Sequence, residues 1–383
     1  MLIGVIIKSL FILIVMVAGL APVITWIERK QSAVMQDRIG ANRADVNGIT
    51  LLGLLHPLAD VFKLISKEDV VPHGANRIMH LISPVIAAVP AVIAFAVIPF
   101  GGVYTIGGET ISLVAANPDW GLLYIFAIGS IAMYGTVMAG WSSNNNWSLI
   151  GGLRASAQMI SYEVTMGLSV VGVFMVFGTL QLQDMAVAQD GTFRIFGFLE
   201  NLFGLALPPW LDWISLPAWG VFYQPLGFVM FLTTIMAENK RPPFDTPEGE
   251  SEIIAGYHLE YSGMRFGLFF MAEFIEVLVI AGLMTTIFLG GWSVPWLPTE
   301  TIIAAVAGIF GEGFATGICI IVHFLAFMLK VVFMIWLQMA LRWTLPRFRY
   351  DQVMDLCWKI ILPLSIANIF VTGAVILISE GGA

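Results

Sequence analysis

Eight long apolar runs constrain the fold of this chain more than any other feature. Each is near or above the roughly 20 residues that an α-helix needs to cross a bilayer. The chain is 58% hydrophobic with a mean hydropathy of +0.87, which excludes an ordinary soluble domain. The sequence therefore predicts an all-α polytopic membrane protein with eight transmembrane helices in one membrane domain, residues 1–383. The runs are 2–27, 78–100, 119–140, 157–180, 218–238, 264–289, 314–341 and 357–379, of which 218–238 is the weakest because it contains Pro225.

Basic residues predict the orientation of these helices. The connections after the first, third, fifth and seventh runs, with their edges, hold 15 of the 18 lysines and arginines. The connections after the second, fourth and sixth runs hold one, Arg194, and the other two are Lys8 and Lys330. By the positive-inside rule, the odd-numbered connections lie on the cytoplasmic or matrix side and both termini lie outside.

The first connection contains a second kind of helix. Residues 50–66 place apolar side chains at helical spacing on one side, and His56, Asp60, Lys63 and Lys67 on the other. This pattern predicts an amphipathic helix at the inner membrane interface. A helix that only anchors the connection has the same pattern. Between the fourth and fifth runs, residues 196–210 form a short apolar segment that predicts a re-entrant or surface helix.

Carboxylates concentrate between Glu238 and Glu276. This stretch holds eight of them in a chain that is only 11% charged: Glu238, Asp245, Glu248, Glu250, Glu252, Glu260, Glu273 and Glu276. Glu273 and Glu276 lie three residues apart inside an apolar run, hence on one helix face. Ionisable groups at membrane depth cost about 2.5–3.5 kcal/mol each and commonly mark proton or ion paths. The alternative for Glu248 to Glu252 is a solvated acidic loop.

Two further charges fall inside apolar runs. Glu163 lies in the fourth run and is either a protonatable relay member or the structural partner of a nearby basic residue. Lys330 lies in the seventh run, and we expect it to be the counter-charge of some of the buried carboxylates, because an unpaired buried charge tends to neutralise. The sequence has no CxxC motif and no phosphate-binding loop, so we expect no redox centre and no metal site in this chain.

Several motifs resemble one family. They are Glu28-Arg29-Lys30, residues 56–68 (HPLADVFKLISKE), 140–147 (GWSSNNNW), 149–163 (LIGGLRASAQMISYE), 243–252 (PFDTPEGESE), Glu260-Tyr261, Ala272-Glu273, and Arg342 followed by residues 346–352 (PRFRYDQ). In this order they resemble the quinone-site membrane subunit of proton-pumping NADH:quinone oxidoreductase, respiratory complex I, a family with bacterial and mitochondrial members. The resemblance runs from residue 28 to about 360.

The resemblance implies a function. A quinone, ubiquinone or menaquinone, would enter through a tunnel from the bilayer and be reduced by an iron–sulfur cluster of a partner subunit, and an acidic row would couple this reaction to proton translocation. NADH, FMN and the iron–sulfur clusters would belong to partners of the peripheral arm, which would dock on the odd-numbered connections, and small membrane-arm subunits would be further partners. The length favours the cytoplasmic membrane of a bacterium, with periplasmic termini, over a mitochondrial inner membrane.

Motif matching also implies site residues. The proton relay would consist of Glu163, Glu238, Glu250, Glu252, Glu260, Glu273 and Glu276. The quinone tunnel would be lined or gated by Arg29, Arg38, Asp60, Lys63, Arg241, Phe244, Asp245, Arg265 and Arg342. The chain departs from the family's usual pattern at Lys240, where Asn is frequent, at His56-Pro57-Leu58 in place of Gln-Pro-Phe, and at Gly40-Ala41-Asn42 in place of Gly-Pro-Asn.

Two other classes of protein share some of these features. The membrane subunit of an energy-converting hydrogenase or formate hydrogenlyase has a related fold without needing a quinone tunnel. A secondary ion transporter also buries charges, but transporters typically show internal repeats with broken helices at the membrane midplane. We find no such repeat, and the basic residues of the first connection together with Arg342 favour the quinone enzyme.

Overall fold

The computed structural model describes residues 2–106, 109–194 and 215–381. In that part of the chain, seven helical segments are long and apolar enough to cross a membrane. They are Ile6–Met35, Arg77–Val97, Gly121–Ser142, Asn146–Phe177, Gly263–Phe288, Glu312–Thr344 and Tyr350–Ile378. The predicted apolar segment 196–210 lies outside the described residues.

The predicted helix 218–238 is the one apolar run that does not form a long span. The chain forms a single turn, α9 (Gly220–Tyr223), breaks at Gln224, and continues as α10 (Pro225–Glu238). Proline lacks an N–H group and disfavours helical geometry in the preceding residue, which accounts for the break. At about 1.5 Å per residue, the 14 residues of α10 extend about 21 Å, less than the hydrocarbon core.

Four of the seven spans are single helices, and the other three combine consecutive helical elements. The first consists of α1 (Leu2–Phe11), the π-helical η1 (Ile12–Leu20) and α2 (Ala21–Met35), and the second of α4 (Arg77–Ala94) and η3 (Phe95–Val97). Then come α5 (Gly121–Ser142), α6 (Asn146–Phe177), α12 (Gly263–Phe288) and α14 (Glu312–Thr344). The last span joins α15 (Tyr350–Asp355), η6 (Leu356–Ile361) and α16 (Leu362–Gly381).

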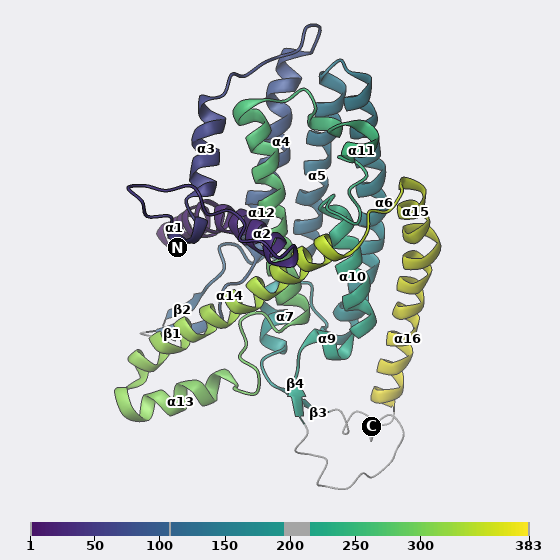
Figure 1. The fold of residues 1–383 in the computed structure, drawn as a ribbon. Helices are drawn as coiled ribbons and strands as arrows, with labels where there is room; N and C mark the ends of the chain where they lie inside the picture. Colours follow the sequence, from purple (N-terminus) through teal and green to yellow (C-terminus); the bar gives the residue numbers. More distant parts are fainter. Residues whose placement is uncertain (1, 107–108, 195–214, 382–383) are drawn as a thin grey trace.

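Helix α12 is the centre of this arrangement. It packs against α2, α3 (His56–Ser66), α4, α7 (Leu182–Ala188), α10 and α14. In Figure 1, α4, α5, α6 and α12 stand side by side and α14 crosses them obliquely. Helix α16 lies at the right-hand edge of the view. In the most apolar 18-residue window of α12, 61% of the residues are buried, against 22% for the last span. Helix α12 is therefore largely enclosed by its neighbours.

Small residues let the central helices approach closely. Gly135 of α5 faces Ala87 and the Ser83 carbonyl of α4, where a side chain would collide with the backbone. Such close packing through small residues is typical of membrane helices, because lipid offers them no hydrophobic drive to associate.

The remaining elements are short. Strands β1 (Val103–Ile106) and β2 (Glu109–Ser112) pair antiparallel with Val103 opposite Ser112, and β3 (Thr192–Arg194) pairs with β4 (Ser215–Pro217). An apolar helix that we did not predict, α13 (Thr299–Phe310), packs on α14. The connection after α10 contains α11 (Glu250–Ile253) and the 3₁₀ turn η5 (Gly256–His258).

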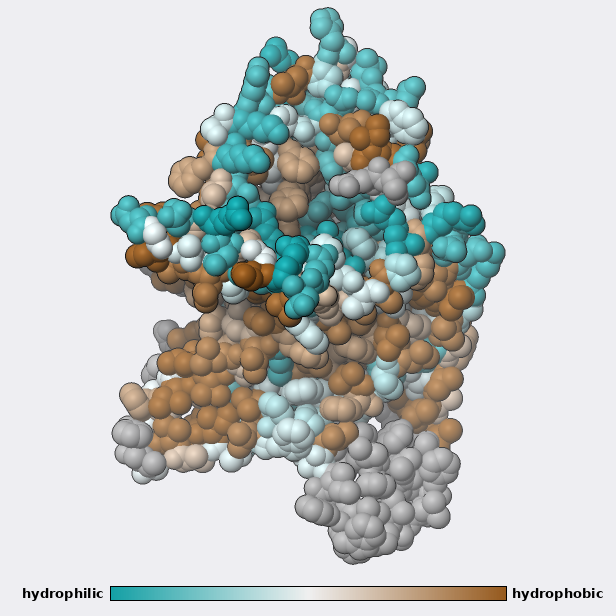
Figure 2. Space-filling model, viewed as in Figure 1, coloured by the Kyte–Doolittle hydropathy of each residue, from teal (hydrophilic) through white to brown (hydrophobic). Residues whose placement is uncertain are grey.

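The first connection differs in detail from the predicted helix 50–66. A 3₁₀ turn, η2 (Leu51–Gly53), precedes α3 (His56–Ser66), and Leu51 and Leu52 have positive φ angles that interrupt a continuous helix. Proline at position 57 suits the first turn of α3. Leu58, Phe62 and Ile65 are exposed on α3. Hydrophilic residues gather across the upper half of the face in Figure 2 and hydrophobic ones across the lower half.

Candidate functional site

Gln158 of α6 anchors the start of the acidic connection. Its buried side-chain amide donates hydrogen bonds to the carbonyls of Ala237 (2.7 Å) and Phe244 (2.8 Å). Its carbonyl accepts a hydrogen bond of 2.5 Å from the hydroxyl of Thr246. Because buried backbone carbonyls need donors, one side chain replaces the backbone partners that the turn after α10 lacks. This anchor fixes the positions of the residues that follow Glu238.

Two arginines from distant parts of the chain meet at the carboxylate of Glu28. The guanidinium of Arg241 lies 2.8 Å from one carboxylate oxygen of Glu28, and that of Arg342 pairs with the other oxygen. Arg241 is only 7% exposed and also lies over the ring of Phe274, 4.4 Å from its centroid. We call Glu28, Arg241 and Arg342 the arginine clamp. It joins α2, the turn after α10, and α14.

Beside the clamp lies a cavity of about 220 Å³, which we call the charged cavity. Its polar lining is Lys240, Arg241, Asp245, Glu248, His258, Glu273 and Arg342, and its apolar lining includes Phe266, Phe269 and Phe270. The cavity thus places acidic and basic groups opposite aromatic rings.

Asp245 has an unusual protonation equilibrium for a loop residue. Burial raises the pKa of Asp245 to about 6, against the opposing effect of Arg347, whose guanidinium lies 2.7 Å from the carboxylate. Between about pH 4 and pH 6 the folded protein keeps a proton on Asp245 that the unfolded chain has released, so this residue makes stability fall as the pH rises through that window.

Asp245→Asn should remove this contribution. Relative to the variant, the unfolding midpoint of the wild-type complex should therefore fall as the pH rises from about 4 to about 6. Thermal unfolding of the purified complex at several pH values measures the difference. Wild-type and variant curves that run parallel over the whole window would contradict the assignment.

Two more cavities continue from the charged cavity toward the first connection. One of about 170 Å³ is lined by Thr25, Glu28, Arg29, Ser32, Phe270, Phe274 and Trp343, and it shares Phe270 with the charged cavity. The next, of about 380 Å³, is lined by Arg29, Ser32, Arg38, Gly40, Ala41, Asn42, Arg43 and His56. Because neighbouring cavities share lining residues, the three form a row from the first connection to Glu273 of α12.

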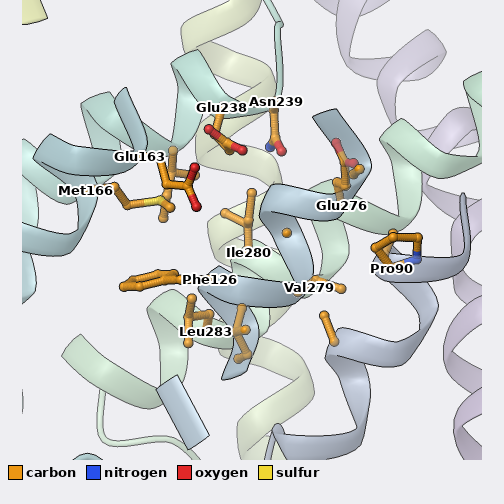
Figure 3. A pocket seen from close by; sticks show the side chains of 16 residues that line it. Pro90, Phe126, Glu163, Met166, Glu238, Asn239, Glu276, Val279, Ile280 and Leu283 are labelled. Atoms are coloured by element: carbon orange, nitrogen blue, oxygen red, sulfur yellow. The ribbon is translucent and has the colours of Figure 1, made fainter. Parts of the chain in front are cut away.

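A fourth cavity, of about 60 Å³, brings together three predicted relay acids. Glu163 of α6, Glu238 of α10 and Glu276 of α12 line it, together with Asn239 and apolar side chains (Figure 3). We call these three residues the carboxylate triad. The hydroxyl of Ser130 hydrogen-bonds to Glu163, and one oxygen of Glu238 is buried without a hydrogen-bond partner. The cavity thus brings carboxyl groups from three different helices to one small space.

Other predicted relay acids lie elsewhere. Glu252 pairs with Arg154 at 2.6 Å, both partly exposed, which fits the alternative of a solvated acidic loop. Glu260 accepts a hydrogen bond of 2.6 Å from Asn145 at the start of α6. The side chain of Glu250 lies outside the described part of the structure.

The predicted tunnel residues also separate into groups. Arg29 pairs with Asp60 at 2.5 Å and thereby joins α2 to α3, while Lys63 is exposed on α3. Arg265 pairs with Asp69 at 2.9 Å and contacts His80, and it does not line the three cavities of the row. The ring of Phe244 packs against the rings of Tyr162 and Phe348, each 5.6 Å away between centroids.

Lys330 does not pair with the carboxylates of α12, contrary to our expectation. Its ammonium donates to the carbonyls of Leu289 (2.6 Å), Gly291 (3.1 Å) and Ser293 (2.6 Å). These carbonyls follow the end of α12, where helical backbone acceptors are left open and a positive charge is favoured. Lys330 is twelve residues from Arg342, about 18 Å along the helix, and so lies too far from the clamp end of α14.

The predicted relay and tunnel residues did not include Glu28, Lys240, Glu248 and Tyr257, although the structure places them in or beside the charged cavity. The position of Glu28 at the inner end of an apolar run was a signal for a buried charge. For Tyr257 no comparable signal exists, because a tyrosine in a loop is ordinary. Among the described residues, no group of three or more His, Cys, Asp or Glu side chains could hold a metal ion.

Comparison with known proteins gives one consistent result. The model of the NADH dehydrogenase family matches residues 7–373. A relative from Geobacter metallireducens, a subunit of its NADH-quinone oxidoreductase, is 43% identical, covering 94% of this chain and 93% of its own. The corresponding subunit of Bdellovibrio bacteriovorus is 39% identical (97% and 96% covered), and that of Thermomicrobium roseum is 41% identical (95% and 94%).

Proposed function

The chain belongs to the NADH dehydrogenase family, and from this premise we propose that it is the membrane subunit in which NADH-quinone oxidoreductase admits quinone and couples its reduction to proton translocation. It is an integral membrane protein and a subunit of an enzyme complex, so other subunits of that complex are its partners. The finer assignments below are our proposal.

The row of three cavities is the observation that carries the proposal. It runs from the first connection, past the arginine clamp, to the charged cavity, and combines basic groups with the aromatic rings of Phe270 and Phe274. A quinone needs apolar walls for its ring and tail and a few fixed polar groups for its two oxygens, which is the usual composition of a ligand pocket. We therefore place the quinone path along this row.

The charges of the row suit the chemistry. Reduction of a quinone to a quinol takes two electrons and two protons, and negative charge develops on the quinone oxygens between these steps. Arg241, Arg342 and Lys240 stabilise such charge, and the cavity carboxyl groups supply protons. The electrons would come from an iron–sulfur cluster of a partner subunit, after NADH and FMN on other partners. Ubiquinone and menaquinone both fit this chemistry.

The proton path would lead on from Glu273 in the charged cavity to the carboxylate triad. Glu250, Glu252 and Glu260 would belong to the rim of this path, and Arg38, Asp60, Lys63 and Arg265 to the outer part of the quinone path. The exposed apolar face of α3 suits a membrane interface. The peripheral arm would dock on the odd-numbered connections, and the termini would lie in the periplasm of a bacterial cytoplasmic membrane.

An affinity-tagged chain tests this function. We would purify it from mildly solubilised native membranes and assay the eluate for NADH-driven reduction of a short-chain quinone. Inhibitor-sensitive quinone reduction that travels with flavin and iron–sulfur clusters is the expected result. Hydrogenase activity without quinone reduction would instead support the hydrogenase membrane subunit and remove the role of the cavity row.

A further inference from the structure

The phenolic hydroxyl of Tyr257 lies between the acidic connection and α12, beside a direct side-chain contact of Glu248 with Glu273. Tyr257 in η5 is 1% exposed, and its phenolic oxygen lies 3.1 Å from a carboxylate oxygen of Glu248 and 3.1 Å from one of Glu273. Both acids line the charged cavity, one from the connection and one from the helix. Tyr257 itself lies behind them and is not part of the cavity lining.

The number of protons available limits which hydrogen bonds Tyr257, Glu248 and Glu273 can form at one time. A phenol has one proton to donate, and an ionised carboxylate can only accept. Tyr257 can therefore donate to Glu248 or to Glu273, but not to both at once. The second hydrogen bond forms only if the other acid is protonated and donates to the phenolic oxygen. With both hydrogen bonds made, the two acids hold one proton between them.

We propose that Tyr257 is the relay residue that passes a proton between Glu248 and Glu273, an inference that rests on the proton-coupling function proposed above. In the step, the O–H bond of protonated Glu248 breaks and its proton joins the phenolic oxygen. The phenol's own proton leaves at the same time and forms an O–H bond with Glu273. One negative charge moves from Glu273 to Glu248, the tyrosine is neutral before and after, and rotation of its hydroxyl resets the relay. The same step run backwards returns the proton from Glu273 to Glu248.

The surroundings of Tyr257 hold the hydroxyl in place for such a step. Its ring packs edge-on against Phe269 (5.5 Å between centroids) and His258 (5.0 Å), and the Lys240 ammonium lies 5.6 Å from the ring centroid. Burial raises the pKa of Tyr257 well above its usual value, and the two neighbouring carboxylates add to this effect. A phenolate is therefore disfavoured, and a concerted exchange of two protons is the route that avoids it.

Tyr257→Phe in the complete, membrane-reconstituted complex is the decisive variant, because it keeps the ring contacts and removes only the hydroxyl. We expect a fall of about 100-fold or more in kcat and in the rate of proton translocation, the usual scale for removing a positioned proton-transfer group. The KM for quinone should change little, since the ring does not line the cavity. A residue with only a structural role would not produce this split between kcat and KM.

Tyr162→Phe is the matched control. Tyr162 is equally buried and its hydroxyl makes one hydrogen bond, of 2.8 Å, to the carbonyl of Val353. It lies outside the proposed relay, and wild-type rates are expected.

Infrared difference spectra give a second measurement that does not depend on Tyr257→Phe assembling. The band of the shared protonated carboxyl should disappear in both Glu248→Gln and Glu273→Gln.

The outcomes separate this inference from the function on which it rests. If Glu273→Gln stops translocation while Tyr257→Phe keeps the wild-type kcat, the tyrosine relay is overturned and the coupling function stands. If Glu273→Gln keeps full coupling, the proposed proton path itself fails. If Tyr257→Phe does not assemble, the infrared spectra of Glu248→Gln and Glu273→Gln decide whether the two acids share a proton. Loss of the protonated-carboxyl band in both variants supports the shared proton. A band that survives unchanged in both variants overturns it.

Discussion

Glu28→Gln should lower NADH-driven quinone reduction by about 100-fold and reduce the amount of assembled complex. The substitution keeps the shape of the side chain but leaves two guanidinium groups facing each other without the carboxylate that joins them. Removing one partner of a buried ion pair costs about 3–5 kcal/mol, because the remaining charge stays buried and uncompensated. Activity per mole of assembled complex, together with the yield of complex from membranes, measures the two effects separately.

The double variant Glu28→Gln/Arg342→Met tests the cause. If charge imbalance is responsible for the poor assembly, removing one arginine should restore part of the yield without restoring quinone reduction. Asp355→Asn is the matched control, because it breaks an exposed pair with Lys359 at 2.7 Å that is expected to contribute about 0–1 kcal/mol. Normal yield and normal activity of Glu28→Gln would show that the clamp is dispensable.

Glu276→Gln should uncouple proton translocation from quinone reduction. Glutamine matches the size of glutamate but cannot take up or release a proton, so the carboxylate triad loses its α12 member. We expect the ratio of protons moved to NADH oxidised to fall by about 100-fold or more, since a positioned proton carrier is worth roughly 10²–10⁴ in rate. The complex in sealed vesicles with an internal pH-sensitive dye gives both rates in one experiment.

Glu163→Gln, at the opposite wall of the same cavity, should have the same phenotype, because both acids line one small space (Figure 3). Glu312→Gln is the control: Glu312 is exposed in the first turn of α14. An unchanged ratio in both Glu276→Gln and Glu163→Gln would remove the triad from the proton path. A lower ratio in Glu312→Gln as well would indicate a general leak.

The long helices were predictable because their cause is local. An apolar run of sufficient length must satisfy its backbone hydrogen bonds internally, and only a helix does so within one segment. Residues 218–238 are the apolar run that does not form one long helix. The sequence indicated this weakness in part, since Pro225 marks the position where α9 and α10 separate. The predicted start of the amphipathic helix, residue 50, was wrong, because α3 begins at His56. Hydrophobic spacing does not reveal the positive φ angles of Leu51 and Leu52 that interrupt the helix.

The acids show the limit of helical periodicity. Three residues apart, Glu273 and Glu276 were assigned to one helix face, and the structure places both in α12, where each is partly buried. Yet Glu273 lines the charged cavity with Lys240 and Arg241, whereas Glu276 lines the small cavity with Glu163 and Glu238. The choice between them depends on which neighbouring helix covers each side chain, and spacing along one helix carries no such information.

The sequence by itself determined the membrane class, the position of most helices, the stretch of the chain that handles charge, and the family. Those follow from local hydropathy and from motifs that can be read along the chain. Only the tertiary structure decided the partners of each charge: Glu28 meets Arg241 and Arg342 across separations of 213 and 314 residues, and Lys330 meets backbone carbonyls instead of carboxylates. The reason is that a buried charge is stabilised by whatever lies within a few ångströms of it, and helix packing alone brings those groups together.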